Sequence, residues 1–371
     1  MLNSTQTFNL SLPKSIAKTF WFSLLLLILV SFVLACMSGV MELSFNQVLG
    51  VFFSVFSGEN TDKTHSLVIL NLRFARAVLA FFGGAALGVA GLILQNVLQN
   101  PLADAFTLGV ASGSAFGAVL ALVLGLPVFV YVFGVQVPLL SFMALFGALL
   151  ALIFVFFIAF NTQKKARSLA SETLILAGVI CSSFLAALIS LLKALNEDAV
   201  PGIVFWIMGS FQGKSWTEFQ LMLPLSVLGF VLIYLFKRPL DLLSLGNIQA
   251  TQLGVSTRSI RLVLILGASA LSAATVSVAG IIGFVGLLVP HFVRLLFLRL
   301  GYSVLPSKLI LPTALIGGLL LLWADVLARR LLSFGVYLGF NNLSGVDLPV
   351  GVVTALIGVP FFCWILKYRY E

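Results

Sequence analysis

Long apolar runs separated by short polar breaks dominate this sequence. About ten such runs can be counted, and each is close to the roughly 20 residues that a helix needs to span a bilayer. None alternates apolar and polar residues as the strands of an outer-membrane barrel do. The pattern predicts an all-α integral membrane protein with about ten transmembrane helices, near residues 20–40, 77–98, 107–126, 138–160, 171–193, 219–237, 261–279, 282–299, 308–328 and 348–367.

The eighth run is the most distinctive, because glycines and a proline punctuate it. Residues 280–294 read GIIGFVGLLVPHFVR, with His291 and Arg294 one helical turn apart. Leucine and isoleucine would suit a lipid-facing helix better, whereas glycines allow backbones to approach or a helix to break where it lines protein. We predict an interrupted helix, with Pro290 contributing to the interruption and with His291 and Arg294 marking a structural cytoplasmic boundary.

Small residues recur every four positions in two other runs. Gly109, Gly113 and Gly117 have this spacing in the third span, and Gly84 and Gly88 have it in the second. Residues four apart share one face of a helix, and small residues there let helices approach closely. We predict that these glycines serve helix packing rather than contact with a substrate.

Composition agrees with a membrane protein of one domain. Hydrophobic residues make up 61% of the 371 residues and charged residues only 9%, against roughly 25% charged in soluble domains. No linker or repeat divides the chain, so residues 1–371 are predicted to form a single transmembrane domain. The net charge of +9 fits basic cytoplasmic loops better than nucleic-acid binding: with both termini cytoplasmic, 14 of the 21 basic residues fall inside.

The sequence contains no recognisable energy-converting or metal-binding motif. Residues 209–215 resemble a phosphate-binding loop but are one residue too short, and the two histidines lack ligand partners at suitable spacing. Three unpaired cysteines lie in apolar runs, and Glu172 and Asp325 are the main candidates for buried acids. We therefore expect no cofactor in this chain and a transport pathway driven by something other than this chain.

The longest loop on the predicted cytoplasmic side, residues 239–260, has apolar residues at helical spacing and glycines at 246 and 254. Two short helices joined by a bend are predicted there. Such helices could lie on lipid or in the groove of a partner protein, and the residues alone do not favour either.

Several ordered motifs resemble those of the permease subunits of type II ABC importers, the FecCD family. They are LRFAR at 72–76, GLILQNVLQNPLADAFTLG at 91–109, WIMGSFQGKSW at 206–216, LGNIQATQLGV at 245–255, GIIGFVGLLVPHFVR at 280–294, ADVLAR at 324–329 and DLPVGVVTALIGVPFF at 347–362. The resemblance runs from about Arg73 to Lys367. It implies ten helices, a second permease subunit, and cytoplasmic ATPase subunits that bind ATP and Mg²⁺. It also implies a periplasmic substrate-binding protein.

The resemblance assigns the 239–260 loop to coupling with the ATPase, which favours the partner groove over lipid. The usual acidic residues are replaced by Asn247, Ile248 and Gln249, so contacts through these positions depart from the family pattern. The residues implied in coupling are Leu245, Gly246, Gln249, Ala250, Leu253 and Gly254.

Basic residues on the periplasmic rim pair with glutamates of the binding protein in this family. The matching positions here are Arg73, Arg76 and Arg329, and arginine suits directional pairing with carboxylates. The alternative is that they are interfacial residues with their charged ends in water. Asp325, four residues before Arg329, is a further candidate partner for it.

The cytoplasmic gate of the family corresponds to Asn100 and Leu102, with a second element at Ser171 and Glu172 by a weaker alignment. A bulky apolar residue can seal a pore by dewetting. A purely structural turn is the alternative for Asn100, because Pro101 follows it.

One segment departs from the family. Residues 333–346 are inserted before Asp347, and their aromatic residues Phe334, Tyr337 and Phe340 are expected either to contact the binding protein or to pack on the bundle.

The resemblance implies a multi-pass permease of the bacterial inner membrane that imports a siderophore or haem iron chelate, since most of the family handles iron. Cobalamin and molybdate are the alternatives, as is an ion-coupled carrier that uses Glu172 or Asp325. A homodimer is expected, with a sister permease as the other possible arrangement.

Overall fold

The computed structural model describes residues 14–39, 41, 43–57, 62–132, 135–162, 171–337 and 347–370. In chain order, its elements are α1 (Lys14–Met37), α2 (Phe45–Ser57), α3 (Lys63–Ser66), the π-helix η1 (Leu67–Phe74), α4 (Ala75–Val97), the 3₁₀-helix η2 (Ala105–Leu108), α5 (Val110–Val123), β1 (Phe129–Val132), β2 (Val135–Pro138), α6 (Leu139–Thr162), α7 (Ser171–Leu195), the 3₁₀-helix η3 (Glu197–Ala199), α8 (Val200–Ile207), α9 (Trp216–Leu235), α10 (Lys237–Leu243), α11 (Asn247–Gln252), α12 (Thr257–Ala279), α13 (Val285–Arg299), α14 (Pro306–Tyr337) and α15 (Val350–Tyr370).

Each of the ten predicted spans coincides with one α-helix, so the all-α membrane fold is confirmed. Within the described ranges, seven helical segments are long and apolar enough to cross a membrane, and α5 and α15 contain shorter apolar segments. The apolar segment of α2 (Phe45–Val55) is also short. Its length falls well below that of a span, which is why the apolar-run count missed it. The antiparallel hairpin β1–β2 and the short helix α8 were missed as well.

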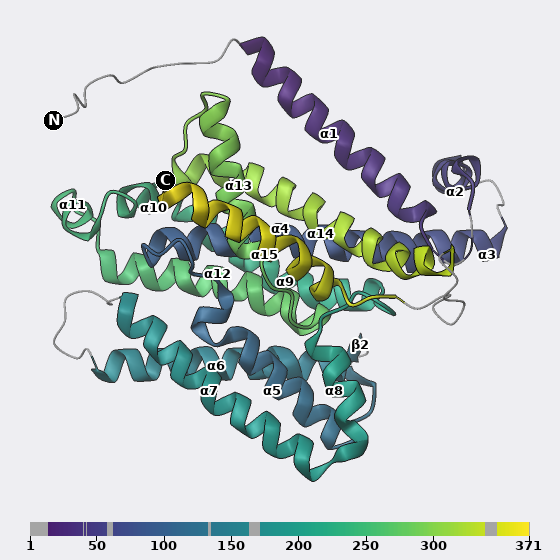
Figure 1. Ribbon diagram of the computed structural model, residues 1–371, viewed down its shortest axis with the longest axis horizontal. Helices are drawn as coiled ribbons and strands as arrows, with labels where there is room; N and C mark the ends of the chain where they lie inside the picture. The colour runs from purple at the N-terminus through teal and green to yellow at the C-terminus, as the bar shows by residue number, and fades with distance from the viewer. Residues whose placement is uncertain are drawn as a thin grey trace.

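Two helices form the centre of the bundle. The most apolar stretches of the segment Lys63–Val97, which ends with α4, and of α12 are 89% and 83% buried, compared with 28% in α1. Figure 1 shows α5, α6 and α7 together on one side of α12, with α13 and α14 on the other side and α1 at the periphery. The same view places α10, α11 and the C-terminus at one end of the bundle and α2 and α3 at the opposite end.

Glycines allow the central helices to touch through their backbones. A Cβ atom on Gly84 of α4 would lie 2.2 Å from the carbonyl oxygen of Gly317 in α14, and one on Gly113 of α5 would lie 2.5 Å from that of Gly147 in α6. Both distances are too short for any side chain. The predicted packing role of these glycines is therefore confirmed, whereas Gly109 instead occupies a left-handed position (φ 74°) directly before α5.

The predicted interruption of the eighth span is confirmed at its beginning but is wrong at Pro290. Gly280 and Phe284 both have positive φ values, 74° and 68°, which separate α12 from α13. Pro290, by contrast, lies inside α13. A proline in a helix leaves the carbonyl four residues earlier without its helical donor. Here the Gly286 carbonyl accepts a hydrogen bond from Nε2 of Gln95 at 3.1 Å, so the helix continues.

Candidate functional site: an ion-pair cluster at one end and a gate region at the other

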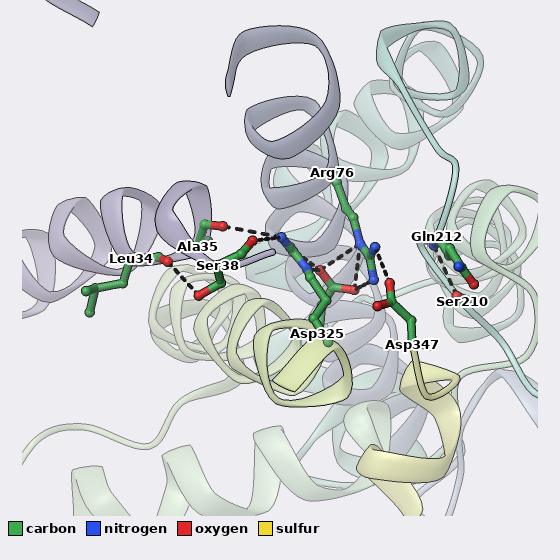
Figure 2. A network of polar contacts seen from close by, with 9 residues as sticks. Leu34, Ala35, Ser38, Arg76, Ser210, Gln212, Asp325 and Asp347 are labelled. Carbon is green, nitrogen blue, oxygen red and sulfur yellow. Dashed lines mark hydrogen bonds and ion pairs between the residues drawn. The ribbon is translucent and has the colours of Figure 1, made fainter. Parts of the chain in front are cut away.

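Charged side chains from three parts of the chain meet at the α2–α3 end of the bundle (Figure 2). Arg76, in the first turn of α4, donates to Asp325 of α14 through Nε at 3.0 Å and Nη2 at 2.8 Å. Its Nη1 donates to Asp347, just before α15, at 2.7 Å. The Asp325 side chain is fully buried, whereas those of Arg76 and Asp347 are 12% and 14% exposed.

Arg329 binds the other side of Asp325. Its Nε donates to Oδ2 of Asp325 at 3.0 Å, and its Nη1 donates to the carbonyl oxygens of Ala35 and Ser38 at 3.3 and 3.2 Å. These carbonyls lie at the C-terminal end of α1, where helical carbonyls lack partners and the helix dipole is negative. Together, Arg76, Asp325, Arg329 and Asp347 form what we call the ion-pair cluster.

Arg73 caps the same end of α1 without a carboxylate. Its Nη1 donates to the carbonyl oxygens of Cys36 and Met37 at 2.9 and 3.1 Å, and its Nη2 donates to that of Met41. The residue is 7% exposed. The positive charge of Arg73 therefore interacts with the backbone carbonyls at the C-terminal end of α1.

The three arginines predicted to dock a binding protein are therefore engaged inside this chain. The alternative of a local Asp325–Arg329 pair is confirmed. Asp347 was missed as the second partner of Arg76, because 271 residues separate them and nothing in the local pattern links them. Docking itself stays a prediction, and an incoming carboxylate would compete with partners already present.

At the opposite end, Asn100 and Leu102 form a tight turn after α4. The side-chain oxygen Oδ1 of Asn100 accepts a hydrogen bond from the backbone nitrogen of Leu102 at 2.9 Å. The structural-turn role for Asn100 is therefore present in the fold. Leu102 is 53% exposed, so its apolar side chain is available to seal a pathway, and the gate assignment stays a prediction.

The second predicted gate element lies beside the end of α4. Ser171, the first residue of α7, accepts a hydrogen bond through Oγ from Nη2 of Arg261 at 2.8 Å. Glu172 is exposed. Arg261 belongs to α12 and is itself buried, although its sequence position placed it among the basic residues of the cytoplasmic loops. The signal that could have located it is its position directly before the apolar run LVLIL at 262–266.

Gln95 joins α4 to α13 in the same region. Its Oε1 accepts from Nη2 of Arg294 at 2.6 Å, while its Nε2 binds the Gly286 carbonyl as described above. Arg294, in the second half of α13, thus makes a structural contact with α4, and its place at a cytoplasmic boundary stays a prediction. Gln95 was missed because the polar pair Gln95–Asn96 does not indicate which other helix its side chains contact.

Asp104 lies between α4 and α5 and caps η2. Its Oδ1 accepts hydrogen bonds from the backbone nitrogens of Phe106 and Thr107 at 3.0 and 3.2 Å. Burial raises the pKa of this carboxyl to about 6, and the two backbone hydrogen bonds oppose that shift. Burial therefore has a larger effect on this pKa than the two hydrogen bonds.

The predicted pair of short helices in the 239–260 loop is confirmed as α10 and α11. Gly246 and Gly254 take positive φ values of 114° and 82° at the two ends of α11. Three apolar side chains in this region are exposed: Leu245 at 57%, Ile248 at 72% and Leu253 at 60%. Gln249 is exposed too.

Ala250 is fully buried and faces the bundle, so it positions α11 and leaves the other residues outward. Ile248, the most exposed of the apolar side chains here, was not among the residues implied in coupling.

Part of the prediction cannot be placed. Residues 338–346 of the predicted insertion lie outside the described residues, and so do the side chains of Phe334 and Tyr337. Among the residues that are described, no group of three or more His, Cys, Asp or Glu side chains could hold a metal ion.

Comparison with known proteins extends over nearly the whole chain. The model of the FecCD transport family matches residues 26–368. An uncharacterized ABC transporter permease protein, YvrB of Bacillus subtilis, is 37% identical over 91% of this chain and 90% of its own length. The molybdate import system permease protein MolB of Haemophilus influenzae is 34% identical over 94% of this chain and 95% of its own.

A solved structure has the same fold. It is described as an inward-facing conformation of a metal-chelate type ABC transporter, and it matches with a TM-score of 0.74 and 32% identity over 95% of this chain and 99% of that chain. The ten spans, the motif order and these similarities agree. The chain is a multi-pass membrane protein that belongs to the FecCD transport family of ABC transporter permeases.

Proposed function

We propose that this chain is one of two membrane-spanning subunits of an ATP-driven importer, and that it moves an iron chelate, a siderophore or haem, inward across the bacterial inner membrane. The observation that carries this proposal is the similarity, along 95% of the chain, to a metal-chelate type ABC transporter. Iron is the first choice because several of the relatives are iron permeases, such as the probable iron chelatin permease of Helicobacter pylori, 33% identical over 81% of this chain, and FecD of Escherichia coli, 35% identical over 81%. The cobalamin permease BtuC of Halobacterium salinarum is 36% identical over 83%, so identity alone does not separate the substrates.

The exposed apolar residues in and beside α11 support a separate ATPase partner. Leu245, Ile248 and Leu253 project from the end of the bundle rather than from its lipid-facing middle. An amphipathic helix of this kind fits a groove in another protein. Two such loops, one from each permease subunit, would pass the motion of two ATPases to the bundle. A homodimer is the simplest form of this assembly.

Docking of a periplasmic binding protein at the other end would involve the partly exposed members of the ion-pair cluster, and its carboxylates would compete for Arg76 with Asp325 and Asp347. Arg76 and Asp347 retain some exposure there, so carboxylates on an incoming protein can reach this pair. Charge complementarity of this kind steers encounter more than it adds affinity.

An ion-coupled carrier is disfavoured by the surroundings of its two candidate acids. Asp325 is held by the guanidinium groups of Arg76 and Arg329, which leaves it no role as a free proton carrier. Glu172 is exposed at the end of α7 rather than buried in a pathway.

Uptake by cells that lack the gene tests the proposal. Labelled ferric siderophores, haem, cobalamin and molybdate would be compared, with the wild-type gene restored on a plasmid. We expect that cells without the gene selectively lose the uptake of an iron chelate. If only the uptake of cobalamin or of molybdate is lost, that compound is the substrate instead of an iron chelate. Uptake that persists when the phosphate-binding lysine of the ATPase is replaced would refute the ATP-driven mechanism.

A further inference from the structure

Arg261 occupies the point where the α10–α11 loop enters the bundle. It lies in the second turn of α12, which begins directly after that loop. Its side chain is 2% exposed, and it is the largest of the fully buried side chains. A buried guanidinium group costs free energy unless its donors are well bound, so its partners indicate what it does.

Two of its partners belong to other helices. Nε and Nη2 of Arg261 donate to the backbone carbonyl of Val97 at 3.1 and 2.6 Å, and Nη2 also donates to Oγ of Ser171 at 2.8 Å. Val97 is the last residue of α4, three positions before Asn100, and Ser171 begins α7. One side chain of α12 thus holds the ends of the two segments that carry the predicted gate residues.

The α10–α11 loop is bound to the same region by further contacts. Nε2 of Gln99, beside Asn100, donates to the carbonyl of Leu243 at the end of α10 at 3.4 Å. Asp241 of α10 accepts from the backbone nitrogen of Ser307 in α14 at 2.8 Å. Buried apolar residues of α10, α11, α12 and α4 form one cluster: Leu240, Leu243, Ala250, Ile260 and Val97. Displacement of the loop therefore moves the beginning of α12.

We propose that Arg261 is a positioning residue that transmits movement of the α10–α11 loop to both gate segments, so that Asn100–Leu102 and Ser171–Glu172 move together. The inference rests on the proposed function, because it requires an ATPase that moves the loop. The planar guanidinium group reaches two acceptors on different helices in fixed geometry, which the single ammonium group of lysine does not reproduce.

The test uses the purified complex with its ATPase in lipid nanodiscs and a reporter cysteine in the gate. Cys363 is exposed and is replaced by serine, whereas Cys36 and Cys181 are buried and can stay. Leu102→Cys then supplies the reporter, and its labelling rate by a maleimide is measured with and without ATP–Mg²⁺. In this parent complex, ATP should change the rate by about fivefold or more, as for an ordinary coupling between two sites.

Arg261→Lys should bring the ratio of the two rates close to one. Ser171→Ala, which removes only one acceptor, should lower the ratio by a smaller factor. Arg258→Lys is the matched control: it lies one turn earlier on α12 with its guanidinium over the ring of Phe160, and it should keep the parent ratio. A substitution that only destabilises the fold would lower the melting temperature, or change the labelling rates with and without ATP by the same factor. The ratio of the two rates would then stay the same.

The possible outcomes distinguish a failure of the role proposed for Arg261 from a failure of the proposed ATP-driven function. Uptake by the wild-type complex that does not depend on ATP would contradict the ATP-driven function itself, whereas a Leu102→Cys parent whose labelling rate does not respond to ATP would overturn the inference that this gate segment moves. A responding parent whose ratio is unchanged by Arg261→Lys and by Ser171→Ala would overturn the role of Arg261. If Arg261→Lys does not fold, Ser171→Ala decides: a parent-like ratio overturns the inference, and a reduced ratio supports it.

Discussion

Replacement of Asp325 by asparagine should lower the thermal stability of the bundle strongly, because this one carboxylate neutralises two buried arginines. Arg76 and Arg329 both donate to it, and its side chain is fully buried. Removing one partner of a buried ion pair costs about 3–5 kcal/mol, since the other charge is left unpaired. With an unfolding entropy of about 2.1 cal/mol/K per residue, the melting temperature of this chain of 371 residues should fall by roughly 4–6 °C.

Asp347→Asn should destabilise the bundle less than Asp325→Asn. This carboxylate makes a single 2.7 Å contact with Arg76 and is 14% exposed, and the amide retains an acceptor oxygen. A loss of about 1 kcal/mol is expected, as for partly solvated pairs. Arg330→Gln, an exposed arginine adjacent to Arg329, should have no measurable effect.

A thiol-reactive dye provides the assay in detergent. Cys36 and Cys181 are buried and become reactive only on unfolding, and the exposed Cys363 is replaced by serine to remove the background. The reasoning fails if Asp325→Asn melts within 1 °C of the parent, or if Asp347→Asn is destabilised equally. Either result would mean that burial does not set the cost of losing the carboxylate.

Three further predictions follow from the described contacts. Burial raises the pKa of Asp104 in the folded state from 3.8 to about 6, so ionisation of this carboxyl destabilises the fold increasingly as the pH rises from 3.8 to 6, and by about 3 kcal/mol above that range. Asp104→Asn should therefore increase the free energy of unfolding by at most about 3 kcal/mol at pH 8, keep about half of this gain at pH 5 and lose it only below about pH 4; a constant gain from about pH 8 to about pH 4 would contradict the assignment. Gly91→Ala places a Cβ 1.8 Å from the Gly286 carbonyl and should destabilise by about 1–3 kcal/mol or more, whereas Gly283→Ala meets no atom within 4 Å and should melt like the parent. Ile248→Asp should reduce co-purification of the ATPase at unchanged melting temperature, and full recovery of the ATPase would argue against docking through α11.

The sequence predicted the spans because bilayer thickness imposes a length that apolar runs reveal directly. It also predicted α10 and α11, because apolar residues at helical spacing together with the glycines at 246 and 254 favour two short helices joined by a bend. Neither α2 nor α8 reaches span length, and so neither stood out from the loops.

The pattern of apolar and polar residues could not predict contacts between residues far apart in the sequence. The Asp325–Arg329 pair was foreseeable from its four-residue spacing, whereas Arg76–Asp347 and Arg261–Ser171 depend on how whole helices associate. Arg261 illustrates the reason most clearly. Counting charges on each side of a membrane assigns a basic residue to a side, but it does not say whether the side chain points to water or into the bundle.

The backbone contacts at Gly84–Gly317 and Gly113–Gly147 limit how this bundle can change shape. Helices that touch through backbone atoms have no flexible side chains between them to absorb sliding or rotation. A shift of one residue along α4 would bring a Cβ atom against a carbonyl oxygen of α14. Within the chain, α4 with α14 and α5 with α6 must therefore move as rigid units, and a change of access must come from hinges between such units or from the interface with a second permease subunit.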